Sequence, residues 1–274
     1  NSGAHAVFLD ANAEVENLIG CIQKDLNTLS DPNKKKRYRA LAQLHKDFQV
    51  LFSRANLESS ESKENLKTNS QATDTLDYEN GVEPVLSNLF SHVAKPLLKR
   101  FGDPGEKCRE KAVVIVSEFA RLVPNVHQFL PFIIPVLRHR MSSKTEHPYF
   151  SKRVQLAGAQ DDLADVREEN EDDEDLFAWT TPDPTEQSEE LRLLNVQLLR
   201  IIINKCQKQM LPFLSDTVTL FVLALGDRFP DVKRECFYCI EKVCELFPVK
   251  MRGCSVDLAK IVMPSLIHKL ARIR

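Results

Sequence analysis

Long apolar runs and glycine are both scarce in this chain of 274 residues. The longest uninterrupted apolar run, Leu220–Leu225, is far shorter than the roughly 20 residues that a helix needs to cross a bilayer. We therefore expect no membrane-spanning segment. Only eight glycines occur and none stands in a phosphate-cradling array, so we do not expect a nucleotide-binding loop. The opening NSGAHA lacks a basic region followed by an apolar core and does not predict a secretory signal.

Catalytic and metal-binding patterns are also missing from the sequence. The histidines show no HxxxH or HExxH spacing, and no serine stands in a Gly-x-Ser-x-Gly elbow. Cys236, Cys239 and Cys244 have metal-like spacing, and a zinc site would need Cys254 or His268 to complete it. The alternative is buried thiols, because Cys236 falls on the apolar side of its predicted helix. We expect reduced cysteines in a cytosolic protein, with no metal, no cofactor and no enzymatic activity.

The charge is unevenly distributed along the chain. The formal net charge is −2, but residues 161–190 hold fourteen acidic residues and one basic residue, Arg167, and so carry −13. The other 244 residues therefore carry +11. A run of like charges with few apolar residues is typical of a solvated, disordered loop. We expect a disordered acidic insertion at 142–187 and a second, Ser-, Asn-, Glu- and Thr-rich disordered insertion at 55–81.

A short pattern recurs four times, in which an acidic residue stands six positions before a basic one. The pairs are Asp31 with Arg37, Asp103 with Arg109, Asp227 with Lys233 and, more weakly, Glu186 with Arg192. Each basic residue opens a segment with the apolar spacing of an amphipathic helix. The aspartate can accept backbone hydrogen bonds at the start of that helix. The basic residue can reach the aspartate of a neighbouring repeat.

The spacing of these pairs predicts the fold. The intervals between the basic residues are 72, 83 and 41, so a period of 41 leaves 31 and 42 extra residues for the two insertions. A period near 40 with two helices per unit is typical of stacked helical hairpins. We predict an all-α, right-handed α-solenoid of HEAT-type hairpins, about four and a half repeats in a single domain. The repeats are 12–54 (helices 12–29 and 33–54), 82–123 (82–101 and 104–123), 126–206 (126–141 and 187–206), 210–247 (210–225 and 229–247) and 256–274 (helix 256–273).

The segment 256–274 is expected to be the first helix of a fifth repeat without its second helix. Its apolar side should then be exposed or covered by another molecule. The residues on that side are Ile261, Val262, Leu266 and Leu270. The expectation is a piece of a longer solenoid, truncated at its C-terminus.

Several stretches resemble a known family. The run Glu189–Leu199, with Pro230–Cys236 some forty residues on, is similar to the N-terminal region of the HEAT-repeat dynein axonemal assembly factors. Lys34–Leu41, and Ser255–Leu258 leading into Pro264–Ile267, fit the same family. The resemblance covers most of 15–52, 84–141 and 187–270, whereas the long acidic insert departs from it. It implies a cytoplasmic, cilium-associated, non-enzymatic factor that helps dynein heavy and intermediate chains assemble with chaperones.

A basic cluster marks the first predicted hairpin turn. Lys34, Lys35, Lys36 and Arg37 are either a solvated helix start or a contact for an acidic partner such as tubulin tails or nucleic acid. Nucleic acid is the poorer fit, because few aromatics interleave with the basic residues and the acidic insert would repel phosphates. Arg192, Lys233 and Arg234, which open later helices, are further candidate contacts.

An aromatic pair follows the acidic run. Phe177 and Trp179, the latter the only tryptophan, come directly after the acidic residues 171–175. The pair predicts a docking motif that binds either the basic body of its own solenoid or a partner. The alternative is a solitary aromatic pair in a flexible loop.

Two functions of different class fit these observations. One is an assembly scaffold whose concave second-helix surface holds client subunits. The other is a HEAT-repeat transport or microtubule-associated adaptor that binds cargo or tubulin. A tubulin-binding array needs exposed basic and aromatic residues in several successive turns, and only the first turn offers a basic cluster. We expect protein partners, with no nucleic acid and no membrane.

Overall fold

The computed structural model describes residues 2–68, 82–142 and 185–266. Its chain divides into two compact units, residues 1–132 and 133–274, and each is described here by itself. Helices and short 3-10 turns make up the described residues, and no strand occurs among them. The prediction of an all-α fold is therefore confirmed. Most of the two predicted insertions, residues 69–81 and 143–184, lies outside the described part of the chain.

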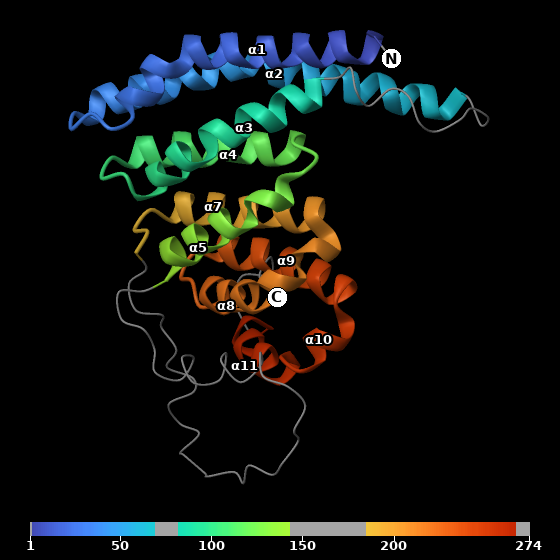
Figure 1. Cartoon of the computed structure of the whole chain (residues 1–274). Helices are drawn as coiled ribbons and strands as arrows, with labels where there is room; N and C mark the ends of the chain where they lie inside the picture. The colour runs from blue at the N-terminus through green and yellow to red at the C-terminus, as the bar shows by residue number, and fades with distance from the viewer. Residues whose placement is uncertain (1, 69–81, 143–184, 267–274) are drawn as a thin grey trace. The chain divides into compact units, whose positions relative to one another are not determined.

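The first unit consists of two helical hairpins in two layers. The helices are α1 (Ser2–Thr28), α2 (Lys34–Thr68), α3 (Val82–Lys99) with the 3-10 turn η1 (Arg100–Gly102), and α4 (Glu106–Leu122). Helix α1 lies along α2, and α3 lies along α4 (Figure 1). The first helices α1 and α3 contact each other, as do the second helices α2 and α4. Each hairpin thus buries its apolar face against the other.

Phenylalanines form the centre of this unit. Phe119 of α4 lies edge-on to Phe48 and Phe52 of α2, with ring centroids 5.1 and 4.9 Å apart, and stacks on Phe90 of α3 at 4.8 Å. Phe90 in turn contacts Phe129 of the 3-10 turn η2 (Val126–Phe129). Such ring pairs stabilise a core beyond their buried area, typically by about 0.5–1.5 kcal/mol each. Four segments are therefore tied together by one aromatic cluster.

The second unit repeats the two-layer arrangement. Its helices are α5 (Leu130–Met141), which begins in the first unit, then α7 (Glu189–Cys206), the 3-10 segment η5 (Gln207–Phe213), α8 (Leu214–Leu225), α9 (Pro230–Leu246), α10 (Pro248–Arg252) and α11 (Ser255–Leu266). The second helices α7 and α9 contact each other, α8 contacts α9, and α11 contacts α8. As in the first unit, first helices therefore contact first helices and second helices contact second helices.

Several predicted helix ends differ from the structure: α1 begins at Ser2 rather than at 12, and residues 55–68 of the predicted disordered insertion are helical. Helix α2 continues to Thr68, beyond the predicted end at 54, because Glu, Lys and Leu in this stretch favour a helix without needing a core. The predicted helix 256–273 is preceded by α10, which was not predicted. A helix of five residues is too short to show a periodicity in the sequence. Helix α10 is held by Met251, which is buried. The side chains of Ile261, Val262, Leu266 and Leu270 lie outside the described residues.

One stretch of the described chain, Glu189–Leu225, is long and apolar enough to span a membrane by length and composition, since it contains an 18-residue window with a mean hydropathy of 1.2. It comprises α7, η5 and α8 and is interrupted at η5, which contains Pro212. Helix α7 also carries Arg192 and Asn195 on its buried face. An amphipathic helix packed against α9 accounts for this composition, since core helices of globular proteins pass the same test.

Candidate protein-interaction surfaces

The turns between paired helices are joined by buried ion pairs. In the first unit, Arg37 donates from Nε to Asp103 Oδ2 at 2.6 Å and from Nη2 to Asp103 Oδ1 at 2.7 Å. Its Nη1 donates to the carbonyls of Asp31 and Pro32, both at 2.8 Å. Arg37 therefore joins its own turn to that of the next hairpin, and its guanidinium is almost fully satisfied. Such bidentate arginine–carboxylate pairs are among the stronger side-chain hydrogen bonds.

The second unit repeats this geometry. Arg192 donates from Nε to Asp227 Oδ2 at 2.6 Å and from Nη2 to Asp227 Oδ1 at 3.0 Å. Its Nη1 donates to the carbonyls of Glu186 and Gln187. Arg37 and Asp103 are 66 residues apart, and Arg192 and Asp227 are 35 apart. The difference of 31 residues equals the insertion that the sequence assigns to the first interval.

Each acidic residue of the pattern also closes its own turn. The side chains of Asp31, Asp103, Glu186 and Asp227 accept a hydrogen bond from the backbone N–H two residues on, at 2.8–3.2 Å. Burial alone would raise the pKa of Asp103, but the hydrogen bonds from Arg37 and Gly105 outweigh it and lower the pKa. The backbone hydrogen bond from Asn33, with a contribution from Lys36, lowers the pKa of Asp31. The folded protein therefore favours the ionised form of Asp31 and of Asp103.

The predicted interaction residues divide into buried and exposed groups. Arg37 and Arg192 are only 6% and 7% exposed, because each is buried in its ion pair. Lys34, Lys35 and Lys36 are exposed, and within the described part of the chain only Lys36 of the three makes an ion pair, 3.1 Å from Asp31. The candidate pair Phe177 and Trp179 lies outside the described residues.

The two remaining candidates stand at the start of α9. Arg234 is half-exposed and lies 3.1 Å from Asp231 on the same helix. Lys233 occupies the position that Arg37 and Arg192 hold in their hairpins. It is half-buried, and burial lowers its pKa while the charge of Asp227 opposes that shift. No described residue forms a salt bridge with it.

A polar cluster joins the second helices of the first unit. His45 Nε2 of α2 lies 2.7 Å from Glu118 Oε2 of α4, and Lys111 Nζ lies 3.3 Å from His45 Nδ1. Gln49 Nε2 also lies 2.8 Å from His45 Nε2, so the imidazole contacts Glu118, Lys111 and Gln49. Gln49 donates to both oxygens of Glu118 at 3.2 Å. Four half-buried or exposed side chains thus form one polar patch across α2 and α4.

The second helices of the other unit carry a comparable patch. Arg200 Nε of α7 lies 2.6 Å from Glu235 Oε1 of α9, and the guanidinium lies 5.6 Å from the centroid of the Tyr238 ring. Arg200 and Tyr238 stay partly exposed, at 43% of the side chain and 47% of the residue. Arginine and tyrosine at such positions are enriched among the residues that dominate protein interfaces.

Sequence reasoning missed both patches, because their partners are brought together only by packing of separate helices. One signal was available. His45 and Arg200 each stand eight positions after the ion-pairing arginine of their helix, Arg37 and Arg192. Eight residues are about two helical turns, so His45 and Arg200 lie on a part of the helix surface that neighbours the ion-pairing arginine.

The described cysteines of the cluster lie in different surroundings. Cys236 and Cys239 are fully buried and lie within 3.9 Å of different backbone carbonyls, those of Phe221 and Val196. Cys244 is exposed. Among the described residues, no group of three or more His, Cys, Asp or Glu side chains is placed to hold a metal ion. Burial raises the pKa of Cys239 to about 12, so it is a packed thiol.

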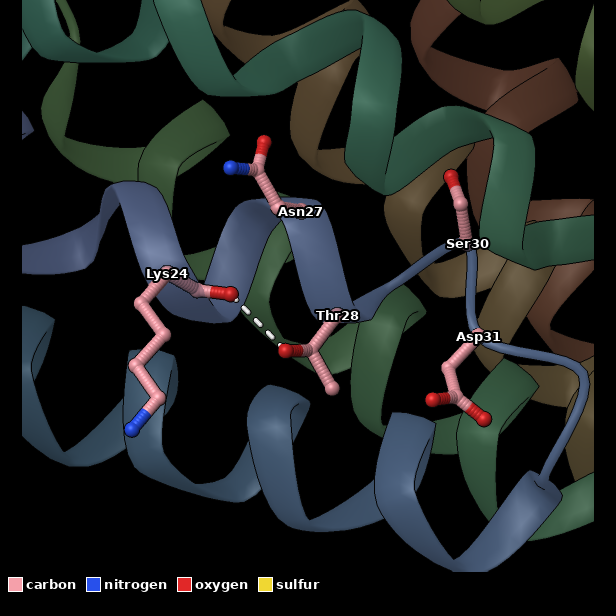
Figure 2. A pocket seen from close by; sticks show the side chains of 5 residues that line it. All are labelled: Lys24, Asn27, Thr28, Ser30 and Asp31. Atoms are coloured by element: carbon pink, nitrogen blue, oxygen red, sulfur yellow. Dashed lines mark hydrogen bonds between the residues drawn. The ribbon is translucent and has the colours of Figure 1, made fainter.

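Two hollows on the described surface are open to solvent. One lies at the end of α1 and is lined by Lys24, Asn27, Thr28, Ser30 and Asp31. Figure 2 shows that Thr28 turns back to the Lys24 carbonyl, to which its hydroxyl donates at 2.8 Å, and that the Lys24 side chain extends away from Asp31. Another lies between the start of α3 and the loop at Pro124 and Asn125.

Helical hairpins stacked in two layers and joined by repeated ion pairs define a helical-repeat protein. The family model described as "Dynein axonemal assembly factor 5-like, TPR repeats" matches residues 57–157 and 179–274, and this chain belongs to that family.

Curated relatives carry the same description. The chain is 27% identical over 253 residues, 92% of its length, to dynein axonemal assembly factor 5 of Xenopus laevis. It is 25% and 26% identical over 178 residues, 65% of its length, to the proteins of the same name from Homo sapiens and Mus musculus. The chain spans about a fifth of the length of these relatives, 22% of the first and 17% of the others.

Proposed function

We propose that this chain is a non-enzymatic, protein-binding scaffold that acts in the cytoplasm in the preassembly of axonemal dynein arm complexes. The observation that carries the proposal is the family match over residues 57–157 and 179–274. The relatives are named as dynein axonemal assembly factors. Dynein heavy and intermediate chains are the proposed clients, with chaperones as co-partners.

The second-helix surfaces are the proposed client sites. In each unit the exposed side of these helices carries a polar patch built on the packed core below it. The patch of the second unit, Arg200 with Glu235 and Tyr238, has the arginine and the aromatic residue that protein interfaces favour. The guanidinium is held in place by Glu235, so little side-chain entropy would be lost on binding.

We propose further that the hairpins form a right-handed HEAT-type solenoid. The family description speaks of TPR repeats. A TPR unit has about 34 residues, whereas the interval from Arg192 to Lys233 is 41 residues, within the HEAT range of about 40–47. The turn aspartates that pair with the arginine of the preceding hairpin support the same repeat type.

A co-precipitation experiment tests the client proposal. The tagged chain is expected to retain dynein heavy and intermediate chains from the cytosol of ciliated cells. The double substitution Arg200→Glu and Tyr238→Ala should reduce their recovery by about tenfold or more, since truncating interface residues of this kind typically costs more than about 1 kcal/mol each and about 1.4 kcal/mol is tenfold in affinity. The control is Arg252→Glu, an exposed residue on α10. Undiminished recovery with the double variant, or equal loss with the control, would contradict the proposed surface.

The runner-up is a transport or microtubule-associated adaptor that binds cargo or tubulin. The exposed lysines 34–36 at the first turn favour it. Co-sedimentation with polymerised tubulin separates the two functions. The scaffold is expected to stay in the supernatant at physiological ionic strength, and an adaptor would pellet with the polymer.

A further inference from the structure

Two hairpin turns of the first unit lie side by side. The Cys108 thiol of α4 lies 3.6 Å from the carbonyl oxygen of Lys34 at the start of α2. A Cβ added to Gly105, just before α4, would lie 3.7 Å from Cβ of Lys34. The first turn of α2 and the first turn of α4 therefore form one continuous edge, held together by the buried pair of Arg37 with Asp103.

Exposed lysines stand in the first turns of both helices. Lys34 and Lys35 of α2 and Lys107 of α4 are exposed, and no described acidic side chain forms a salt bridge with them. The aspartates of the two turns are already engaged, Asp31 by Lys36 and Asp103 by Arg37. We call Lys34, Lys35 and Lys107 the basic turn edge.

The placement of these lysines does not serve the helix. Helix α2 has no acidic residue in its first turn, where the helix dipole favours negative charge, and three lysines stand there instead. This mismatch disfavours the helix. Neighbouring ammonium groups also repel one another. Both costs would be relieved by an anionic partner lying across the edge.

We propose that the basic turn edge binds an extended acidic peptide segment of a protein partner, through carboxylates that lie across Lys34, Lys35 and Lys107. Glu106 and Glu110, exposed on the same helix as Lys107, would repel the dense and continuous charge of a nucleic acid. A peptide can place its carboxylates between them. Tyr38, 38% exposed, is one aromatic residue and does not form the stacking platform that single-stranded nucleic acids use. This site is separate from the second-helix surfaces and does not depend on the client proposal.

Fluorescence anisotropy with the full chain tests the site. The probe is a labelled twelve-residue peptide of alternating glutamate and glycine, titrated at low and at physiological ionic strength. We expect saturable binding that weakens with salt, because exposed charges are screened. The triple variant Lys34→Glu, Lys35→Glu and Lys107→Glu should bind about tenfold more weakly, in line with the contribution of three exposed ion pairs. Circular dichroism and thermal unfolding confirm that each variant is folded.

A matched control separates a site from net charge. The variant Lys208→Glu, Lys250→Glu and Lys260→Glu changes the same total charge at three exposed lysines of the second unit. It should keep the native affinity. Equal weakening by the control, or no saturable binding of the probe by the native chain, would overturn the proposal. Tighter binding of a single-stranded oligonucleotide of the same charge than of the peptide would overturn it as well.

Discussion

Arg37 and Asp103 form a buried bidentate ion pair between successive hairpins, with both contacts at 2.6–2.7 Å and the Asp103 side chain fully shielded from solvent. Arg192 and Asp227 form the corresponding pair in the second unit. In both pairs the arginine also holds two backbone carbonyls of its own turn. One side chain thus holds a turn and its neighbour together.

Removal of the buried carboxylate should destabilise the first unit strongly. We expect Asp103→Ala to lower the free energy of unfolding by about 3 kcal/mol, because it leaves the Arg37 guanidinium buried without its anion. Urea denaturation at pH 7 measures the change. The control Glu106→Ala removes an exposed carboxylate from the same turn and should cost less than about 0.5 kcal/mol. Similar losses for both variants would contradict the structural role of the pair.

The same carboxylate should make stability depend on pH. Because the folded pKa of Asp103 is lowered, its contribution is complete above the unfolded value near 3.8 and is lost as pH falls through the folded pKa. The stability difference between the native chain and Asp103→Asn should therefore be largest at neutral pH and shrink below about pH 4. Denaturant titrations at pH 7, 5 and 3 measure it. A difference that stays constant over this range would refute the linkage.

The fork geometry of Arg192 should matter as well as its charge. We expect Arg192→Lys to cost about 2 kcal/mol, because an ammonium cannot make two parallel bonds to Asp227 and also satisfy the carbonyls of Glu186 and Gln187. Arg234→Lys, at a half-exposed pair with Asp231, is the matched control and should change little. If lysine were tolerated equally well at both positions, bidentate pairing would not be the reason for arginine at 192.

Replacement of Lys233, unlike replacement of Asp103 or Arg192, should not lower the free energy of unfolding. Burial lowers its pKa, so the folded state is penalised below that pKa and the penalty disappears as pH rises toward the unfolded value of 10.5. We expect Lys233→Met to be as stable as the native chain at pH 7 or more stable, by up to about 1 kcal/mol. The exposed Lys250→Met serves as control in the same denaturation assay. A loss of stability specific to Lys233→Met would indicate a favourable contact of its ammonium.

Thiol reactivity should follow burial. Burial raises the pKa of Cys206 to about 11 and that of Cys239 to about 12, and raises that of Cys236 well above its ordinary value. At pH 8 we expect iodoacetamide to label exposed Cys21 rapidly and these three only after unfolding. Mass spectrometry of tryptic peptides gives the rates. Rapid labelling of Cys236 or Cys239 in the folded chain would show that the core of α9 is open.

The repeated acidic–basic spacing was sufficient to predict the helical hairpins and their turns. The hydrogen bonds of Asp103 and Asp227 to the following backbone N–H groups are local, and a residue two positions away determines them. The periodicity of α4 and α9 was likewise visible, because one face of each helix is buried. Helix α10 was missed, since five residues show no period.

Local sequence patterns were enough to predict most of the helices and the acidic turn between the helices of each hairpin, because these depend on contacts within a few residues, whereas the start of α1, the continuation of α2 to Thr68 and the short helix α10 were not predicted. Only the tertiary structure decided which arginine meets which aspartate, and that Arg37 and Arg192 are buried while Lys34 and Lys35 remain exposed. It also decided that His45 meets Glu118, 73 residues away. Those outcomes depend on the direction in which each side chain leaves its helix and on the packing of one hairpin against the next, and no local pattern encodes either.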